Sequence, residues 1–84
     1  MRMDKQTIIE KIEKRIVTEI LKEPGRTLSE NEALISSGLI DSFSLVDLAL
    51  IVEELFDVQI DDAELSADTF DTLDQLADLV QQRL

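Results

Sequence analysis

Residues 38–60, GLIDSFSLVDLALIVEELFDVQI, decide the predicted fold. Asp41 and Ser42 are residue types that favour the start of a helix, and the run from them to Phe56 contains neither glycine nor proline. The sequence therefore predicts a helix over residues 42–56, entered from the loop around Gly38.

Apolar residues lie on two sides of this predicted helix. At about 100° per residue, one broad face gathers the side chains expected to pack on the core. These are Leu45, Leu48, Ala49, Val52, Leu55 and Phe56. A second flank alternates apolar and acidic side chains, namely Phe43, Val46, Asp47, Leu50, Glu53 and Glu54. Such a flank suits a basic, apolar-centred groove on a partner protein. The alternative is that a loop or another helix folds over its apolar members.

The remaining helices are predicted from hydrophobic spacing. Isoleucines recur at helical intervals over residues 4–21, with Asp4 as the candidate N-cap. Residues 62–66 are expected to form a short helix, and Asp71 or Thr72 to begin the last one. The expected fold is all-α: a small bundle of three principal helices plus one short helix, with a long first loop. A chain of 84 residues is expected to form one domain, residues 1–84.

The composition excludes several classes of function. The chain has no cysteine and no histidine, so it offers no disulfide, no thiolate metal site and no imidazole base. A serine hydrolase needs a base beside its nucleophile, and none is visible for Ser42. Residues 57–68 depart from a calcium-binding loop, because Gln59 and Asp68 stand where ligands of another kind are required. We expect no metal site and no catalytic residue, and therefore not an enzyme.

The net charge of −11 is concentrated in one half of the chain. Residues 1–40 hold seven basic and seven acidic residues, whereas residues 41–84 hold twelve acidic residues against Arg83 alone. The negative electrostatic potential of residues 41–84 repels nucleic acid and anionic lipid and attracts basic protein surfaces. The N-terminal segment is charged, and no apolar run approaches membrane-spanning length. We expect a cytoplasmic protein, without membrane insertion and monomeric.

The stretch of residues 38–60 resembles the signature of acyl carrier proteins, the phosphopantetheine-binding carriers. Matching positions occur without a gap at Asp41, Ser42, Val46, Asp47, Leu48, Glu53, Glu54, Phe56 and Ile60. The resemblance implies that a separate phosphopantetheinyl transferase, using Mg²⁺ and coenzyme A, joins phosphopantetheine to the Ser42 hydroxyl. It also implies that Asp41 assists this reaction. The further partners implied are acyl-loading ligases or synthases with basic docking surfaces.

Two features of residues 38–60 bear on the identity of the cargo. Ser44 stands where fatty-acid carriers commonly have an acid, and the spacing from Gly38 to Ser42 looks more like D-alanyl carriers and specialised carriers. Because an aliphatic core could part to shelter a lipid chain, we expect a carrier of acyl thioesters in a specialised lipid or polyketide-type pathway. One alternative is a D-alanyl or other aminoacyl carrier. Another is an acidic helical interaction module that is never modified.

Overall fold

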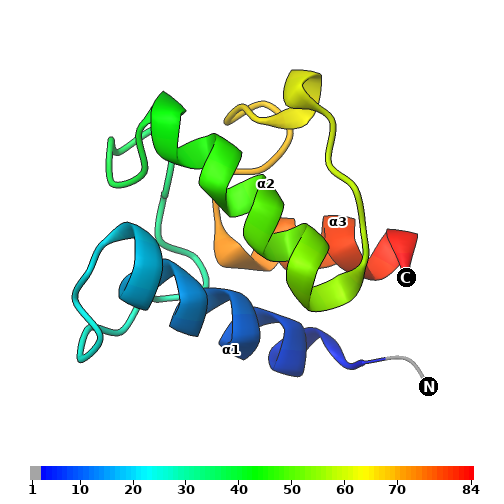
Figure 1. Cartoon of the computed structure of the whole chain (residues 1–84), viewed down its shortest axis with the longest axis horizontal. Coiled ribbons are helices and arrows are strands. Elements are labelled where there is room, and N and C mark those ends of the chain that lie inside the picture. The colour runs from blue at the N-terminus through cyan, green and yellow to red at the C-terminus, as the bar shows by residue number, and fades with distance from the viewer. Residues whose placement is uncertain (1–2) are drawn as a thin grey trace.

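The computed structural model describes residues 3–84, and that part of the chain contains helices but no strand. Its elements are α1 (Lys5–Arg15), the π-helical turn η1 (Ile16–Ile20), α2 (Ser42–Phe56), the 3₁₀ turn η2 (Asp62–Glu64) and α3 (Leu73–Arg83). The predicted all-α fold, with three principal helices and a short one, is confirmed. Figure 1 shows α2 crossing above α1, with α3 behind them and both termini at one end of the molecule.

The helices begin at side-chain caps that the sequence indicates. The Asp4 carboxylate accepts a hydrogen bond of 2.8 Å from the N–H of Thr7 at the start of α1. Of the two candidates for the start of α3, the cap is Thr72, whose hydroxyl accepts from the N–H of Gln75. Each cap satisfies a donor that the first helical turn leaves unpaired.

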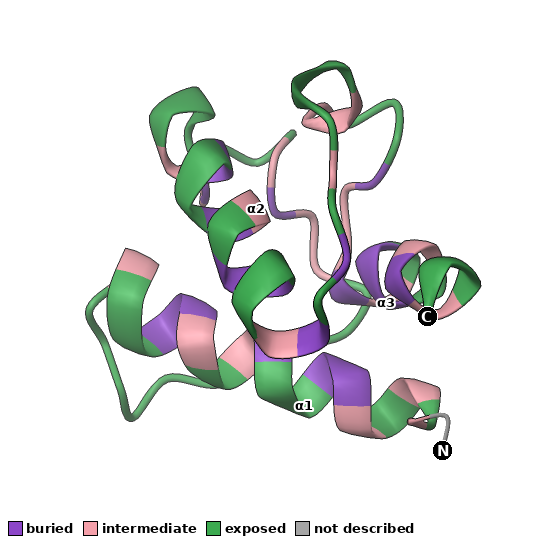
Figure 2. Ribbon diagram, turned by 45° about the vertical axis from the view of Figure 1, so that its right-hand side comes forward, coloured by how far each residue is buried: buried purple, intermediate pink, exposed green. Residues whose placement is uncertain are grey.

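The core lies where the three helices face one another (Figure 2). Most of the core face predicted for α2 is buried: Leu45, Leu48, Val52 and Phe56. Ala49 and Leu55 are only partly buried. Ile51, which the helical wheel left unassigned, is 97% covered, since its relative exposure is 3%. The buried face of α2 is therefore broader than predicted.

The long loop before α2 is fixed to the start of α3. Leu34 is fully buried and donates its N–H to the carbonyl of Asp71 at 2.6 Å. The Asp71 carboxylate accepts from the N–H groups of Ile35 and Ser36 at 2.8 and 2.9 Å, and from the Ser36 hydroxyl at 2.5 Å. One carboxylate therefore connects two segments that are 35 residues apart in sequence.

We expect this connection to make stability depend on pH. The Ser36 hydroxyl and N–H, with the N–H groups of Ile35 and Leu34, lower the pKa of the Asp71 carboxyl. A depressed folded-state pKa gives stabilisation that is present above the unfolded-state pKa and is lost as pH falls through the folded value. Asp71→Asn should therefore lower the melting temperature at pH 7, and the difference from wild type should shrink below about pH 4.

Thermal unfolding followed by circular dichroism between pH 3 and pH 8 measures this difference. Asp68→Asn is the matched control, because Asp68 is exposed and forms no hydrogen bond or ion pair within residues 3–84. A difference between wild type and Asp71→Asn that is constant over the whole pH range would show that the charged form of Asp71 adds nothing.

Candidate functional site

Asp41 and Ser42 form the beginning of α2. Asp41 is the N-cap, and its carboxylate accepts from the N–H of Ser44 at 2.8 Å. This hydrogen bond is the main reason why the pKa of Asp41 is lowered. Ser42 is the first helical residue and is exposed. Since Asp41 provides the cap, the Ser42 hydroxyl is not needed to start the helix and is accessible from solvent.

The loop presents Ser42 from a defined position. Gly38 has φ +83°, in the left-handed region that favours glycine, and its N–H donates to the carbonyl of Ile35. The Ser37 hydroxyl donates to the carbonyl of Ala33 at 2.6 Å, which closes the same turn. Ile40 is 1% exposed, and its N–H donates to the carbonyl of Leu34. The chain is thus held on the core two residues before Ser42.

The beginning of α2 fits a bulky anionic substituent. An exposed hydroxyl leaves room for a large group, and the first N–H groups of a helix, with the positive end of its dipole, favour a phosphodiester anion. The chain contains no histidine to activate Ser42 as a nucleophile. The Ser42 hydroxyl is therefore accessible for the attachment of a group at the positive end of the α2 dipole.

The apolar residues of the second flank of α2 are exposed. The relative exposure is 87% for Phe43, 52% for Val46 and 53% for Leu50. The alternative that another segment folds over them is therefore wrong. Asp47 and Glu53 are also exposed. The predicted mixture of apolar and acidic side chains is accessible, and it begins directly beside Ser42.

Glu54 differs from the other carboxylates of this flank because it has an ion-pair partner. Arg15 lies 3.3 Å from Glu54 and also pairs with Glu19. The pKa of Arg15 is raised, first by the hydrogen bond with Glu19 and then by the charges of Glu19 and Glu54. The sequence predicted Glu54 as part of the partner surface but did not predict its ion pair with Arg15. The two residues lie 39 positions apart, so no local pattern relates them.

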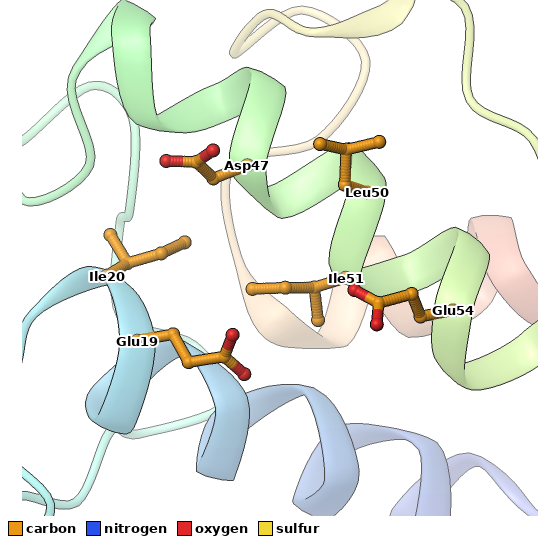
Figure 3. A pocket seen from close by; sticks show the side chains of 6 residues that line it. All are labelled: Glu19, Ile20, Asp47, Leu50, Ile51 and Glu54. Carbon is orange, nitrogen blue, oxygen red and sulfur yellow. The ribbon is translucent and has the colours of Figure 1, made fainter.

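A groove of about 330 Å³ lies between η1 and α2 (Figure 3). Its lining consists of Glu19, Ile20, Asp47, Leu50, Ile51 and Glu54. Sequence reasoning missed Glu19, Ile20 and Ile51. The isoleucine spacing of residues 4–21 fits a regular helix and a helix that ends in a π turn equally well. The spacing therefore does not predict the direction of the side chains in η1.

Residues 3–84 contain neither a cluster of metal ligands nor a membrane-spanning helix. No group of three or more acidic, histidine or cysteine side chains in this range is arranged to hold a metal ion. None of the helices described is both long and apolar enough to cross a membrane.

The chain matches a known protein family over most of its length. A family model described as "Phosphopantetheine attachment site" matches residues 14–80. The chain is 30% identical over 73 residues to D-alanyl carrier proteins of two strains of Lactobacillus delbrueckii subsp. bulgaricus, which covers 84% of this chain and 91% of each relative. No solved structure matches the chain significantly.

Proposed function

Since the chain belongs to the family of phosphopantetheine-binding carrier proteins and carries this group covalently, we propose that the group is attached to the Ser42 hydroxyl. The observation that carries the proposal is the exposed serine at the first position of α2, inside the range that the family model matches. Asp41 caps the helix from the position before Ser42, and the hydrogen bond that it accepts from the Ser44 N–H lowers the pKa of its carboxyl.

The role proposed for the chain is that of a substrate for other enzymes. When bound, the arm supplies a terminal thiol that holds the cargo as a thioester. The chain's own residues position the attachment point and present the surface that partner enzymes contact. We propose that residues 1–84 act as one monomeric carrier domain, without a catalytic group of their own.

A small aminoacyl cargo, such as D-alanine, is favoured over a lipid chain. Both relatives found are D-alanyl carrier proteins. The core side chains between the helices are fully covered, with Leu48, Val52 and Leu76 each 0% exposed. A lipid chain would have to part them and lose their contacts, whereas a small polar group requires no opening. A carrier of acyl chains in a specialised lipid or polyketide-type pathway, as expected from the sequence, is the alternative to this aminoacyl carrier.

The intact mass of the protein tests both parts of the proposal. Incubation with coenzyme A and a permissive phosphopantetheinyl transferase should add one arm. The holo form is then offered to an adenylating ligase with ATP and either D-alanine or a medium-length fatty acid. Addition of D-alanine alone supports the aminoacyl carrier, and addition of the fatty acid alone supports the lipid carrier. A protein that never gains the arm would be the unmodified interaction module.

The exposed flank of α2 is proposed as the docking surface for the transferase and the loading ligase. Its residues are Phe43, Val46, Asp47, Leu50, Glu53 and Glu54. Large apolar groups beside carboxylates complement a basic surface with an apolar centre. Because Glu54 already pairs with Arg15, Asp47 and Glu53 are expected to contribute more of the attraction.

Reversing two charges of this flank should slow association with the transferase. We expect the double variant Asp47→Lys, Glu53→Lys to reduce the association rate about tenfold at low salt, because the attraction between opposite charges accelerates encounter.

Leu50→Ala should instead raise the dissociation rate, because it removes apolar contact area. Surface plasmon resonance at 20 and 300 mM salt measures both rates. The control is Glu10→Lys on exposed α1 surface, and an equal effect of this control would contradict a specific docking surface.

A further inference from the structure

We propose that the loaded arm folds back along α2 and that the ammonium group of an aminoacyl cargo binds in the groove between η1 and α2. The groove would thereby select cargo that carries a free amine. This inference rests on the proposed attachment to Ser42 and on an aminoacyl cargo.

The groove combines an apolar floor with an acidic rim. In Figure 3, Ile20 and Ile51 point toward each other from η1 and α2, and the Glu19 carboxylate points toward α2. Asp47 and Glu54 complete the rim. A methyl group of a small side chain fits the floor, and a primary ammonium fits the carboxylates.

The charge of the groove is negative even after its ion pairs are counted. Arg15 bonds to both Glu19 and Glu54, so two of the three rim carboxylates share one cation. No described residue pairs with Asp47. The rim thus keeps an excess of two negative charges, which attracts an ammonium group and repels a carboxylate.

A path of exposed residues leads from the attachment point to the groove. Residues four positions apart form a row along a helix. Starting at Ser42, this row continues through Val46 and Leu50 to Glu54. Val46 and Leu50 are half exposed, and Leu50 and Glu54 themselves line the groove. The arm can therefore cover apolar surface on its way, which favours the folded-back position over the extended one.

The arm has the length that this path requires. The rise from Ser42 to Leu50 along the helix axis is about 12 Å, at 1.5 Å per residue. The arm is a chain of amide units about as long as four to five extended residues, which reaches about 15 Å. Its thiol end comes to lie beside Leu50, so the amine of the cargo can reach Asp47, the rim carboxylate that Arg15 does not pair with.

Methyl NMR of the intact holo protein tests the position of the cargo. The arm is loaded with D-alanine through a hydrolysis-resistant amide and, for comparison, with a propionyl group, which has the same carbon chain but lacks the ammonium. We expect the methyl resonances of Ile20, Leu50 and Ile51 to shift with the alanyl arm and to shift much less with the propionyl arm. The double variant Glu19→Gln, Asp47→Asn should lose the alanyl-specific shifts.

The matched control is Glu53→Gln, which removes a carboxylate from the same helix without altering the groove lining. Its alanyl-specific shifts should remain. Equal shifts for the two arms, or shifts that persist in the double variant, would overturn the inference. The intact mass of every sample is measured first. A missing arm on the wild-type protein contradicts the attachment to Ser42, whereas a loaded arm without shifts at Ile20 contradicts only the binding of its cargo in the groove.

Discussion

Ser42→Ala should abolish attachment of the arm completely while leaving the protein folded. The transferred phosphopantetheinyl group needs a hydroxyl acceptor, and alanine provides none. Folding should survive because the N-cap of α2 is Asp41, whose bond to the Ser44 N–H does not involve the Ser42 side chain. A surface change of this kind costs about 0.5 kcal/mol or less. Intact mass after incubation with coenzyme A and the transferase gives the result.

The neighbouring serines supply the controls. The Ser36 and Ser37 hydroxyls are engaged with Asp71 and with the carbonyl of Ala33, and Ser44 is only partly exposed. Ser44→Ala should still accept the arm at a rate close to wild type. Modification that persists in Ser42→Ala would move the site to one of these three serines and refute the assignment.

Phe70→Ala should destabilise the fold by about 3–5 kcal/mol. Phe70 is 0% exposed and is among the largest fully buried side chains, so its removal leaves a cavity that closely packed neighbours fill only partly. A domain of this size has little stability in reserve, and a loss of this magnitude is a large part of it. Urea unfolding followed by far-ultraviolet circular dichroism measures the change, since the chain lacks tryptophan and tyrosine.

The variant Phe70→Leu distinguishes destabilisation by a cavity from destabilisation by the loss of the aromatic ring. It keeps most of the apolar volume and should cost about 1.5 kcal/mol or less if its neighbours repack. A Phe70→Ala variant no less stable than Phe70→Leu would contradict the close packing seen around this side chain. Because Phe70 immediately precedes Asp71, the alanine variant should also loosen the anchored loop before Ser42.

Local chemistry made the helices predictable. Asp4, Asp41 and Thr72 are short polar side chains that precede apolar periodic runs, and each one caps the helix that follows it. The exposed flank of α2 was predictable for the same reason, because periodicity within one helix determines which side chains share a face. The attachment of an arm was predicted through the resemblance of residues 38–60, which the family match supports.

Contacts between distant segments could not be predicted in this way. The bonds of Asp71 to residues 35 and 36, and the pair of Arg15 with Glu54, join parts of the chain that are far apart in sequence. These contacts form only because of the way the helices pack, and a local sequence pattern does not predict helix packing. The groove was missed because one of its walls is a π turn, whose wider winding changes the direction of Glu19 and Ile20.

The attachment of the loop to Asp71 has a consequence for the order of events during synthesis. The ribosome releases Ser42 well before residue 71, so a nascent chain exposes the serine before the loop in front of it has an anchor. Until then, residues 33–41 lack the partner that fixes the entrance to α2. The proposed attachment site is therefore presented from an anchored loop only after residue 71 has been synthesised.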